Sequence, residues 1–311
     1  MKKQATREAY GKALLELGQE HQDIVVLDAD LSKSTKTAEF AGVFPERFIN
    51  AGIAEQNLMG MSAGLAAAGK VVFASTFAVF AAGRAFEQIR NSIAYAELNV
   101  KICATHAGIT VGEDGGSHQS VEDVALMRSI PGMCVVVPAD GTSTRQILRD
   151  LYQRSGPAYL RLGRLAVPNI YDEELQLQIG RGIELKDGKD ATIIGCGIMV
   201  EKALQASAIL AGEGIMVSVV DMHTIKPLDQ ELVIKKAKET GAILTVEEHS
   251  IIGGLGSAVC EVVSEYCPVP VLRLGIEDQF GQSGSPDELL QHYGLTVDKI
   301  AQKVRNLLKI L

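Results

Sequence analysis

The amino-acid sequence predicts an α/β protein of two successive domains, each with a mostly parallel sheet covered by helices. Runs of apolar residues rich in Val and Ile recur along the chain, and each leads into a stretch with helical spacing. Continuous apolar strands that alternate with helices are typical of parallel sheets buried on both faces. A length of 311 residues is long for one domain and comfortable for two.

The first series of elements extends to residue 162. Helical spacing over 5–17 predicts a helix, which Gly18 is expected to end. Residues 49–69 are rich in Gly and Ala, and a helix of this composition, with Glu55 in its first turn, is expected where backbones approach closely, against another helix or a ligand. Further helices are predicted up to Arg90 and over 141–152. The predicted strands are residues 23–30, 71–75, 100–106, 134–138 and 158–162.

A polar stretch, residues 163–180, separates the two series and contains Pro168. Because such composition is typical of a linker, we expect domains at 1–165 and 181–311 with a linker at 166–180. The second domain repeats the alternation of strands and helices. Its predicted strands are residues 191–197, 215–221, 242–248 and 270–274. Four helices are predicted: one that ends at Leu210, one over 229–239, one that begins at Gly254 and one at the end of the sequence.

Composition and charge narrow the classes of function. A net charge of −8 and a pI near 5.4 argue against nucleic acid or an anionic membrane as the main partner. No apolar run approaches the ~18–20 residues of a membrane span, and no signal peptide is visible. The five cysteines are scattered, lack metal-ligand spacing and resemble core residues of a reduced protein. We therefore expect a cytoplasmic protein that does not bind membranes.

Glu55 is the first candidate for chemistry, because it is the only charged residue between Ile49 and Gly69. A lone carboxylate in such a run has two interpretations. It is either a solvated residue of the first helical turn, where acids are common, or a buried acid with a catalytic role.

The edge of the first sheet is predicted to collect polar side chains. Ligands of parallel sheets lie beyond the carboxyl ends of the strands. The residues at that edge are Asp30, Ser32 and Ser34 after strand 23–30, Ser75, Thr76 and Phe77 after strand 71–75, His106 after strand 100–106, and Arg161 and Arg164 after strand 158–162.

The glycine-rich loop at 105–120 is the second informative stretch. Its glycines allow tight curvature, and its proton-transfer groups are His106, Glu113, Asp114 and His118. The same loop could simply be a turn that caps a helix starting near Val121. A metal site formed by His106, Asp114 and His118 lacks recognised spacing and is the weaker interpretation.

Three other patterns have mainly structural interpretations. Phe77 and Phe80 are spaced like a core pair near the start of a helix. The G-C-G at 195–197 is a weak indication of dinucleotide binding, because the third glycine is missing. The run 247–258 joins a strand to a glycine-rich helix start that could hold an anion, and we interpret it as close packing.

Five motifs of the sequence resemble the transketolase family, and the resemblance covers the family's pyrimidine-binding and C-terminal domains over essentially all 311 residues. Together the motifs are highly specific, and they lie at the predicted strand edge. They are A-D-L-S-K-S (29–34), F-I-N-A-G-I-A-E-Q-N (48–57), S-T-F-A-V-F (75–80), T-H-A-G-I-T-V-G-E-D-G-G-S-H-Q (105–119) and G-P-A-Y-L-R-L-G-R (156–164).

The resemblance implies a site for thiamine diphosphate. Glu55 resembles the acid that hydrogen-bonds the aminopyrimidine ring and promotes its imino tautomer. Phe77 and Phe80 resemble the aromatic residues around that ring, and Asp30 resembles an acid beside the cofactor.

The resemblance also implies a site for sugar phosphates. The residues that resemble the groups binding sugar hydroxyls and moving protons during C–C cleavage are His106, Asp114 and His118. Those that resemble the groups holding the phosphate are Arg7, Ser34 and Arg164.

Two departures from the family pattern matter. Ala54 and Gln56 flank Glu55, whereas long single-chain transketolases usually have Arg and His there, and the A-E-Q form is shared with 1-deoxyxylulose-5-phosphate synthase. The family's Gly-Asp-Gly motif, which together with a later Asn ligates Mg²⁺ at the diphosphate, is missing from the sequence. We therefore expect half of the cofactor site on another chain.

These observations predict the C-terminal subunit of a split transketolase, which transfers a two-carbon ketol unit from a ketose phosphate to an aldose phosphate. The expected partner is an N-terminal subunit that carries the diphosphate and Mg²⁺ site, in an assembly with two copies of each chain. The alternatives are a 1-deoxyxylulose-5-phosphate synthase-like enzyme or a 2-oxo acid decarboxylase beta chain, which the T-H-A-G and G-E-D-G patterns disfavour. A non-catalytic binding module predicts loss of Glu55 or of the histidines, and all are present.

Overall fold

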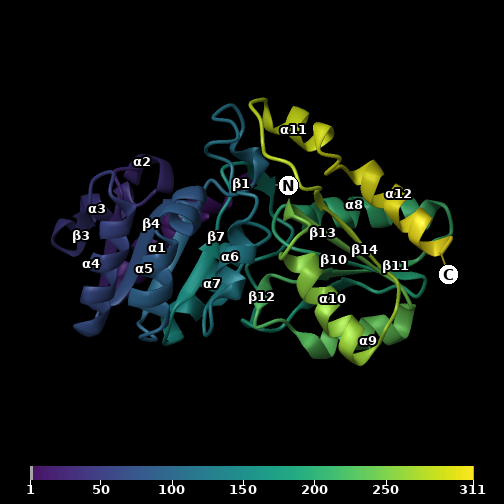
Figure 1. Cartoon of the computed structure of the whole chain (residues 1–311), viewed down its shortest axis with the longest axis horizontal. Coiled ribbons are helices and arrows are strands. Elements are labelled where there is room, and N and C mark those ends of the chain that lie inside the picture. The colour runs from purple at the N-terminus through teal and green to yellow at the C-terminus, as the bar shows by residue number, and fades with distance from the viewer. Residues whose placement is uncertain (1–2, 311) are drawn as a thin grey trace.

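The computed structural model describes residues 3–310, and its two halves lie side by side, each with a sheet and helices around it (Figure 1). The first half, coloured purple to teal, carries the strand edge singled out from the sequence. The second half, coloured green to yellow, includes the C-terminal helices (Figure 1). The α/β class with two mostly parallel sheets is confirmed.

The first sheet has seven strands in the order β12-β6-β7-β5-β4-β2-β3. Its strands are parallel except β12, which pairs antiparallel with β6. Every residue of β2, β4 and β5 is buried, as expected for strands covered on both faces. The strands are β2 (Ile24–Asp28), β3 (Phe48–Asn50), β4 (Val71–Phe77), β5 (Val100–Thr105), β6 (Cys134–Val136), β7 (Ala158–Arg161) and β12 (Thr224–Lys226).

Helices surround this sheet and place the loops at its edge. The segment after β4 contains two π-helical stretches, Phe80–Arg84 and Ile89–Ala94, on either side of α5 (Phe86–Gln88). Such π-helical turns occur frequently at functional sites. The other helices are α1 (Thr6–Glu20), α2 (Ser32–Thr35), α3 (Ala38–Val43), α4 (Glu55–Ala67), α6 (Asp123–Ser129) and α7 (Gly141–Gln153).

The second sheet has five strands in the order β14-β13-β10-β11-β9, parallel except for β9. Its strands are β9 (Ile183–Lys186), β10 (Ala191–Gly195), β11 (Val217–Asp221), β13 (Ile243–Ser250) and β14 (Val271–Ile276). Its helices are α8 (Met199–Gly212), α9 (Gln230–Thr240), α10 (Leu255–Tyr266), α11 (Pro286–His292) and α12 (Val297–Leu308).

The two halves are interwoven at their junction. Strand β12 belongs by sequence to the second half but completes the first sheet. Part of the expected linker is also a strand, because β8 (Ala166–Pro168) pairs with β1 (Lys3–Ala5). The chain therefore crosses between the halves more than once.

Two local expectations are wrong. Helix α1 continues past Gly18 to Glu20, because Gly18 serves close packing: a Cβ there would lie 2.5 Å from a ring carbon of Phe40. Phe77 is the last residue of β4 rather than a residue at a helix start, because the pairing of β4 with β5 continues two residues beyond Ser75.

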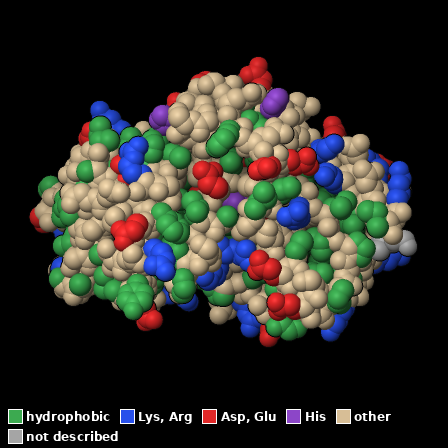
Figure 2. Space-filling model, in the orientation of Figure 1, with side chains coloured by type: hydrophobic (Ala, Val, Ile, Leu, Met, Phe, Trp, Pro, Cys, Tyr) green, Lys and Arg blue, Asp and Glu red, His purple; other side chains and the backbone are tan. Residues whose placement is uncertain are grey.

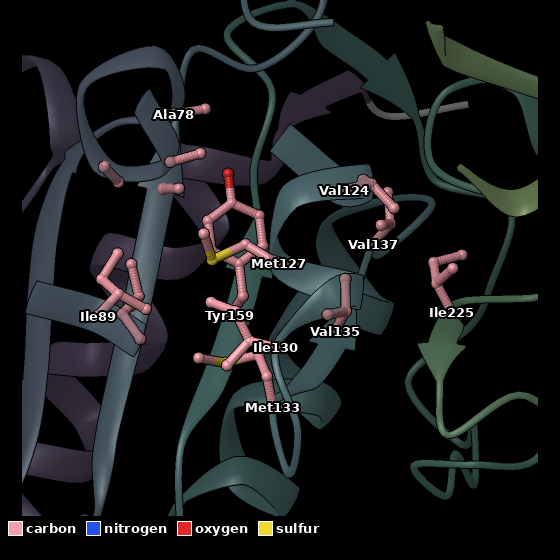
Figure 3. Close-up of a cluster of buried hydrophobic side chains, with 14 of the residues drawn as sticks. Ala78, Ile89, Val124, Met127, Ile130, Met133, Val135, Val137, Tyr159 and Ile225 are labelled. Atoms are coloured by element: carbon pink, nitrogen blue, oxygen red, sulfur yellow. The ribbon is translucent and has the colours of Figure 1, made fainter. Parts of the chain in front are cut away.

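A buried cluster of hydrophobic side chains includes residues of α6 and of the first sheet. Figure 3 shows Met127 and Ile130 close to Tyr159, with Ile225 of β12 on the far side of Val135. The hydroxyl of Tyr159 donates to Asp123 Oδ2 at 2.8 Å. This packing fixes α6, the helix that directly follows the glycine-rich loop.

Candidate active site

The register of two adjacent strands creates the centre of the candidate site. Strands β4 and β5 pair in parallel, with Phe77 opposite Thr105 at their carboxyl ends. His106 follows Thr105, and its ring stacks on the Phe77 ring with 3.9 Å between ring centroids. The strand-edge rule therefore brings these two predicted residues into contact.

A second aromatic ring and a second histidine complete a cluster around Phe77. The Phe80 ring is almost parallel to that of Phe77 at 6.0 Å. The ring of His118 meets Phe80 edge-on at 5.5 Å and Phe77 at 6.4 Å. Phe77 is buried and Phe80 is partly exposed. Both histidines of the glycine-rich loop thus contact the Phe pair.

Glu55 is a buried acid, so the interpretation as a solvated first-turn residue is wrong. It is the first residue of α4, and only 2% of it is exposed. Its Oε2 accepts a hydrogen bond from Arg84 Nη1 at 2.9 Å, and the Arg84 guanidinium also lies 4.8 Å from the centre of the Phe80 ring. Arg84 therefore links the acid to the aromatic cluster.

Sequence reasoning missed Arg84, whose side chain is 51% exposed. The only signal was its position four residues after Phe80, in a segment expected to be helical. That spacing allows contact with Phe80, but nothing in it indicates a partner 29 residues earlier in the chain.

The hydrogen bonds of His106 define a neutral ring. Arg7 Nη1 lies 3.3 Å from His106 Nε2, and because a guanidinium can only donate, Nε2 accepts. The proton is then on Nδ1, which donates to Thr105 Oγ1 at 2.9 Å. Burial lowers the pKa of His106 to about 3, and the positive charges of Arg7 and Arg164 contribute to this lowering.

The residues expected to hold a phosphate fall into two groups. Arg7 lies beside His106 and donates to the backbone oxygen of Ser34 at 2.8 Å. Arg164 donates to the backbone oxygen of Val111, and its Nη1 lies 3.9 Å from Asp114. Burial lowers the pKa of Arg7, and the charge of Arg164 adds to this effect, so the two cations share one electrostatic environment at the rim of the cluster.

Asp30 forms its hydrogen bonds with Asn50 rather than with the aromatic cluster. Its backbone adopts a positive φ of 64°, and its carboxylate accepts from Asn50 Nδ2 at 3.0 Å. Asn50 Oδ1 in turn accepts from the backbone N–H of Gly52 at 2.9 Å. Asp30 therefore supports the turn that leads to Glu55.

Two other sequence features have structural roles. Arg161, expected at the open edge, is buried and donates to Asp123 Oδ2 at 2.8 Å. The glycine-rich start of α10 is closed by the chain's own Glu247, which accepts from the backbone N–H groups of Leu255 and Gly256 at 2.7 and 2.8 Å. The interpretation of the run 247–258 as close packing is confirmed.

One face of the molecule carries mixed charge. Lys, Arg, Asp and Glu side chains are interspersed over the face in Figure 2, without a large patch of one sign. Within residues 3–310, no group of three or more His, Cys, Asp or Glu side chains is arranged to hold a metal ion. Among the helices of the described chain, none combines the length and apolar character needed to cross a membrane.

Comparison with known proteins places these features in a family. The sequence matches the transketolase pyrimidine-binding domain over residues 2–169 and the transketolase C-terminal domain over residues 180–300. A provisionally named transketolase C-terminal section from Methanocaldococcus jannaschii is 54% identical over 97% of this chain and 96% of its own length. One of the subunits of apulose-4-phosphate transketolase from Phocaeicola vulgatus is 41% identical, with 98% of each chain covered.

A solved structure agrees with this placement. A split-gene transketolase, described as an inactive beta4 tetramer, is 57% identical, with a TM-score of 0.90 and 98% of each chain covered. The fold defines a two-domain α/β protein, with a candidate ligand site at the carboxyl ends of its first sheet. The chain belongs to the transketolase family, a family of thiamine-diphosphate-dependent transferases, and it comprises the pyrimidine-binding and C-terminal domains.

Proposed function

We propose that the chain is the C-terminal subunit of a split transketolase that transfers a two-carbon ketol unit from a ketose phosphate to an aldose phosphate. The observation that carries the proposal is the buried carboxylate of Glu55, linked through Arg84 to the cluster of two aromatic rings and two histidines. Relatives that match over their whole length and are named as a section or a subunit support the split arrangement.

The residues fit the pyrimidine end of thiamine diphosphate. The faces of Phe77 and Phe80 suit a flat heteroaromatic ring, and Glu55 offers a carboxylate oxygen that can hold a proton at a ring nitrogen. When bound, the cofactor supplies the nucleophilic carbon that accepts the two-carbon unit. Arg84 bonds to Oε2 of Glu55, so a ring nitrogen would contact Oε1, or Oε2 after the half-exposed side chain of Arg84 moves.

The diphosphate end of the cofactor needs a partner. The chain has no Gly-Asp-Gly motif, and Mg²⁺ prefers oxygen ligands in octahedral geometry. We infer that the N-terminal partner holds Mg²⁺ and the diphosphate. The apolar side chain of Ile53, which is 79% exposed and lies two residues before Glu55, supports burial of this edge of the sheet in an assembly with two copies of each chain.

The substrate side of the site is formed, in this proposal, by the glycine-rich loop and by Arg7 and Arg164. The single lone pair of His106 Nε2 accepts from Arg7, so a donating sugar hydroxyl would take the place of Arg7 there. His118 and Asp114 lie on the same loop. Arg7 Nε is buried and has no hydrogen-bond partner within residues 3–310. An anionic oxygen would satisfy this donor, which supports phosphate binding by Arg7 and Arg164.

The free cysteines support a reduced, cytoplasmic setting.

The test is Glu55→Gln in the enzyme reconstituted with its partner, which native co-purification should identify. The amide keeps the volume but cannot share a proton with a ring nitrogen, so we expect a loss of turnover by several orders of magnitude. Glu87→Gln, at an exposed position in α5, is the matched control and should keep full activity. More than about a tenth of wild-type turnover in the Glu55 variant would refute the role that general acid–base chemistry gives it.

A further inference from the structure

The C-terminal domain contacts the loop that carries both histidines, and the first of these contacts comes from Glu248 near the end of β13. Its Oε1 accepts from the backbone N–H of Thr110 at 2.7 Å. Gly108 makes this approach possible, because a Cβ there would lie 2.2 Å from Glu248 Oε1. The carboxylate is buried against the start of the loop.

The end of the same loop is also bonded to β13. Arg161 Nη2 donates to the backbone oxygens of Glu248 at 2.9 Å and Ser120 at 3.3 Å. The backbone N–H of Ser250 donates to the oxygen of Val121 at 2.7 Å. Both ends of the loop are thus held by one strand of the other domain.

A second contact comes from the segment before α11. The buried amide of Gln119 donates to the backbone oxygen of Gln282 at 2.9 Å, and to Ile109 and Gly112 of its own loop at 3.1 and 3.2 Å. The two adjacent glycines of the loop permit the approach. A Cβ at Gly116 would lie 2.6 Å from the oxygen of Gly281, and one at Gly115 would lie 2.6 Å from Ser283 Oγ.

We propose that the C-terminal domain positions the catalytic loop, with Glu248 and Gln119 as positioning residues for His106 and His118. The glycines at 108, 115 and 116 are required for the approach of the second domain as well as for loop curvature. The inference rests on the proposed function in one respect: the histidines act on substrate. The bracing itself depends only on the contacts within the chain.

The direct test is hydrogen exchange of residues 107–121 in the full chain, measured by mass spectrometry. Glu248→Ala removes a hydrogen bond to a charged group, so exchange at the Thr110 amide and its neighbours should rise at least about tenfold. Glu248→Gln keeps an accepting oxygen and should retain most of the protection. Glu247→Ala is the matched control: its carboxylate is buried in the same strand but bonds to α10, so exchange should rise at Leu255 and Gly256 only.

A second variant keeps the test informative if Glu248→Ala does not fold. Gly281→Ala alters a surface segment, and its Cβ would lie 1.7 Å from Gln119 Oε1, which must move away. We expect faster exchange over residues 109–119 in a chain that stays folded at the temperature of the measurement. Unchanged loop exchange in whichever of these variants fold, or an equal loop response to Glu247→Ala, would overturn the bracing.

Kinetics in the reconstituted enzyme separate positioning from mere stability. Gly281→Ala and Glu248→Ala should lower kcat by roughly tenfold or more, as misplaced catalytic groups do, while cofactor affinity stays within about twofold and Glu248→Gln restores most of kcat. Faster loop exchange with wild-type kcat would overturn the positioning role. If the wild-type assembly shows no ketol transfer although the exchange results hold, the proposed function fails and the bracing stands.

Discussion

At the scale of single residues, His106 shows how the site sets the charge of its groups. Its ring is buried, accepts from Arg7 and has a pKa of about 3. A neutral imidazole with so low a pKa is a weak base, and it can accept a hydrogen bond from substrate at Nε2 once Arg7 moves away.

This neutrality leads to a pH prediction. The ring of His106 should show no titration by NMR between about pH 8 and about pH 5, where an ordinary histidine titrates, with His106→Asn used for assignment. Because the unfolded ring binds a proton near 6.5 and the folded ring only near 3, the contribution of His106 to stability is lost as the pH falls from 6.5 toward 3. A titration midpoint near 6.5 in the folded chain would contradict the buried, Arg-paired geometry.

Arg164 provides a prediction about substrate phosphate. In the reconstituted enzyme, Arg164→Ala should raise KM for phosphorylated sugars roughly ten- to a hundredfold, the equivalent of one charged hydrogen bond. A small donor without phosphate, such as hydroxypyruvate, should be little affected. Arg164 also donates to Val111 of the loop, so equal losses with both donors would show that this structural contact is its main role.

The residue scale also shows where sequence reasoning stops. The motifs placed Phe77, Phe80, His106 and His118 at one edge, and the structure brings them into contact because the ends of paired parallel strands are fixed by register. Arg84 could not be found in this way. Its contact with Glu55 depends on a π-helical turn and on the packing of two segments far apart in the chain.

At the scale of elements, the apolar runs predicted β2, β4, β5, β10 and β13 well because these strands are buried on both faces. The short strands β3, β9 and β12 lack such runs and form only through pairing partners. Glycines were harder to interpret from the sequence, because Gly241 ends α9 whereas Gly18 allows close packing within α1.

Two glycines test that distinction. Gly18→Ala in α1 should destabilise the chain by about 1–3 kcal/mol, because the added methyl group overlaps the Phe40 ring. Gly60→Ala in α4 meets no atom within 4 Å and should leave stability unchanged or raise it by about 0.5–1 kcal/mol. Urea unfolding of both variants at one protein concentration measures the difference. Equal effects would mean that neighbouring side chains do not decide the cost.

At the scale of the whole molecule, the two halves are joined by strand pairing and by hydrogen bonds. The resemblance to transketolase, stated from five motifs, is confirmed by domain matches that cover both halves. No motif indicated that β12 would complete the first sheet or that Glu248 would reach the glycine-rich loop, because both depend on how the halves dock. The expected boundary at 166–180 stays a prediction, and β8 lies within it.

At this scale we propose, above all, that the chain supplies the pyrimidine half of a cofactor site that a partner completes. Glu55, Phe77 and Phe80 lie together in the described chain, whereas the motif for Mg²⁺ and the diphosphate is missing from the sequence. The diphosphate contributes much of such a cofactor's charge-based affinity, so half of a site should bind weakly.

Calorimetric titration of thiamine diphosphate with Mg²⁺ into the isolated chain, and then into the chain with its N-terminal partner, tests this claim most directly. We predict no appreciable heat of binding with the chain alone. With the partner present, we predict saturable binding of one cofactor per pair of unlike chains, accompanied by ketol transfer. Tight stoichiometric binding by the isolated chain, or ketol transfer without a partner, would contradict the claim.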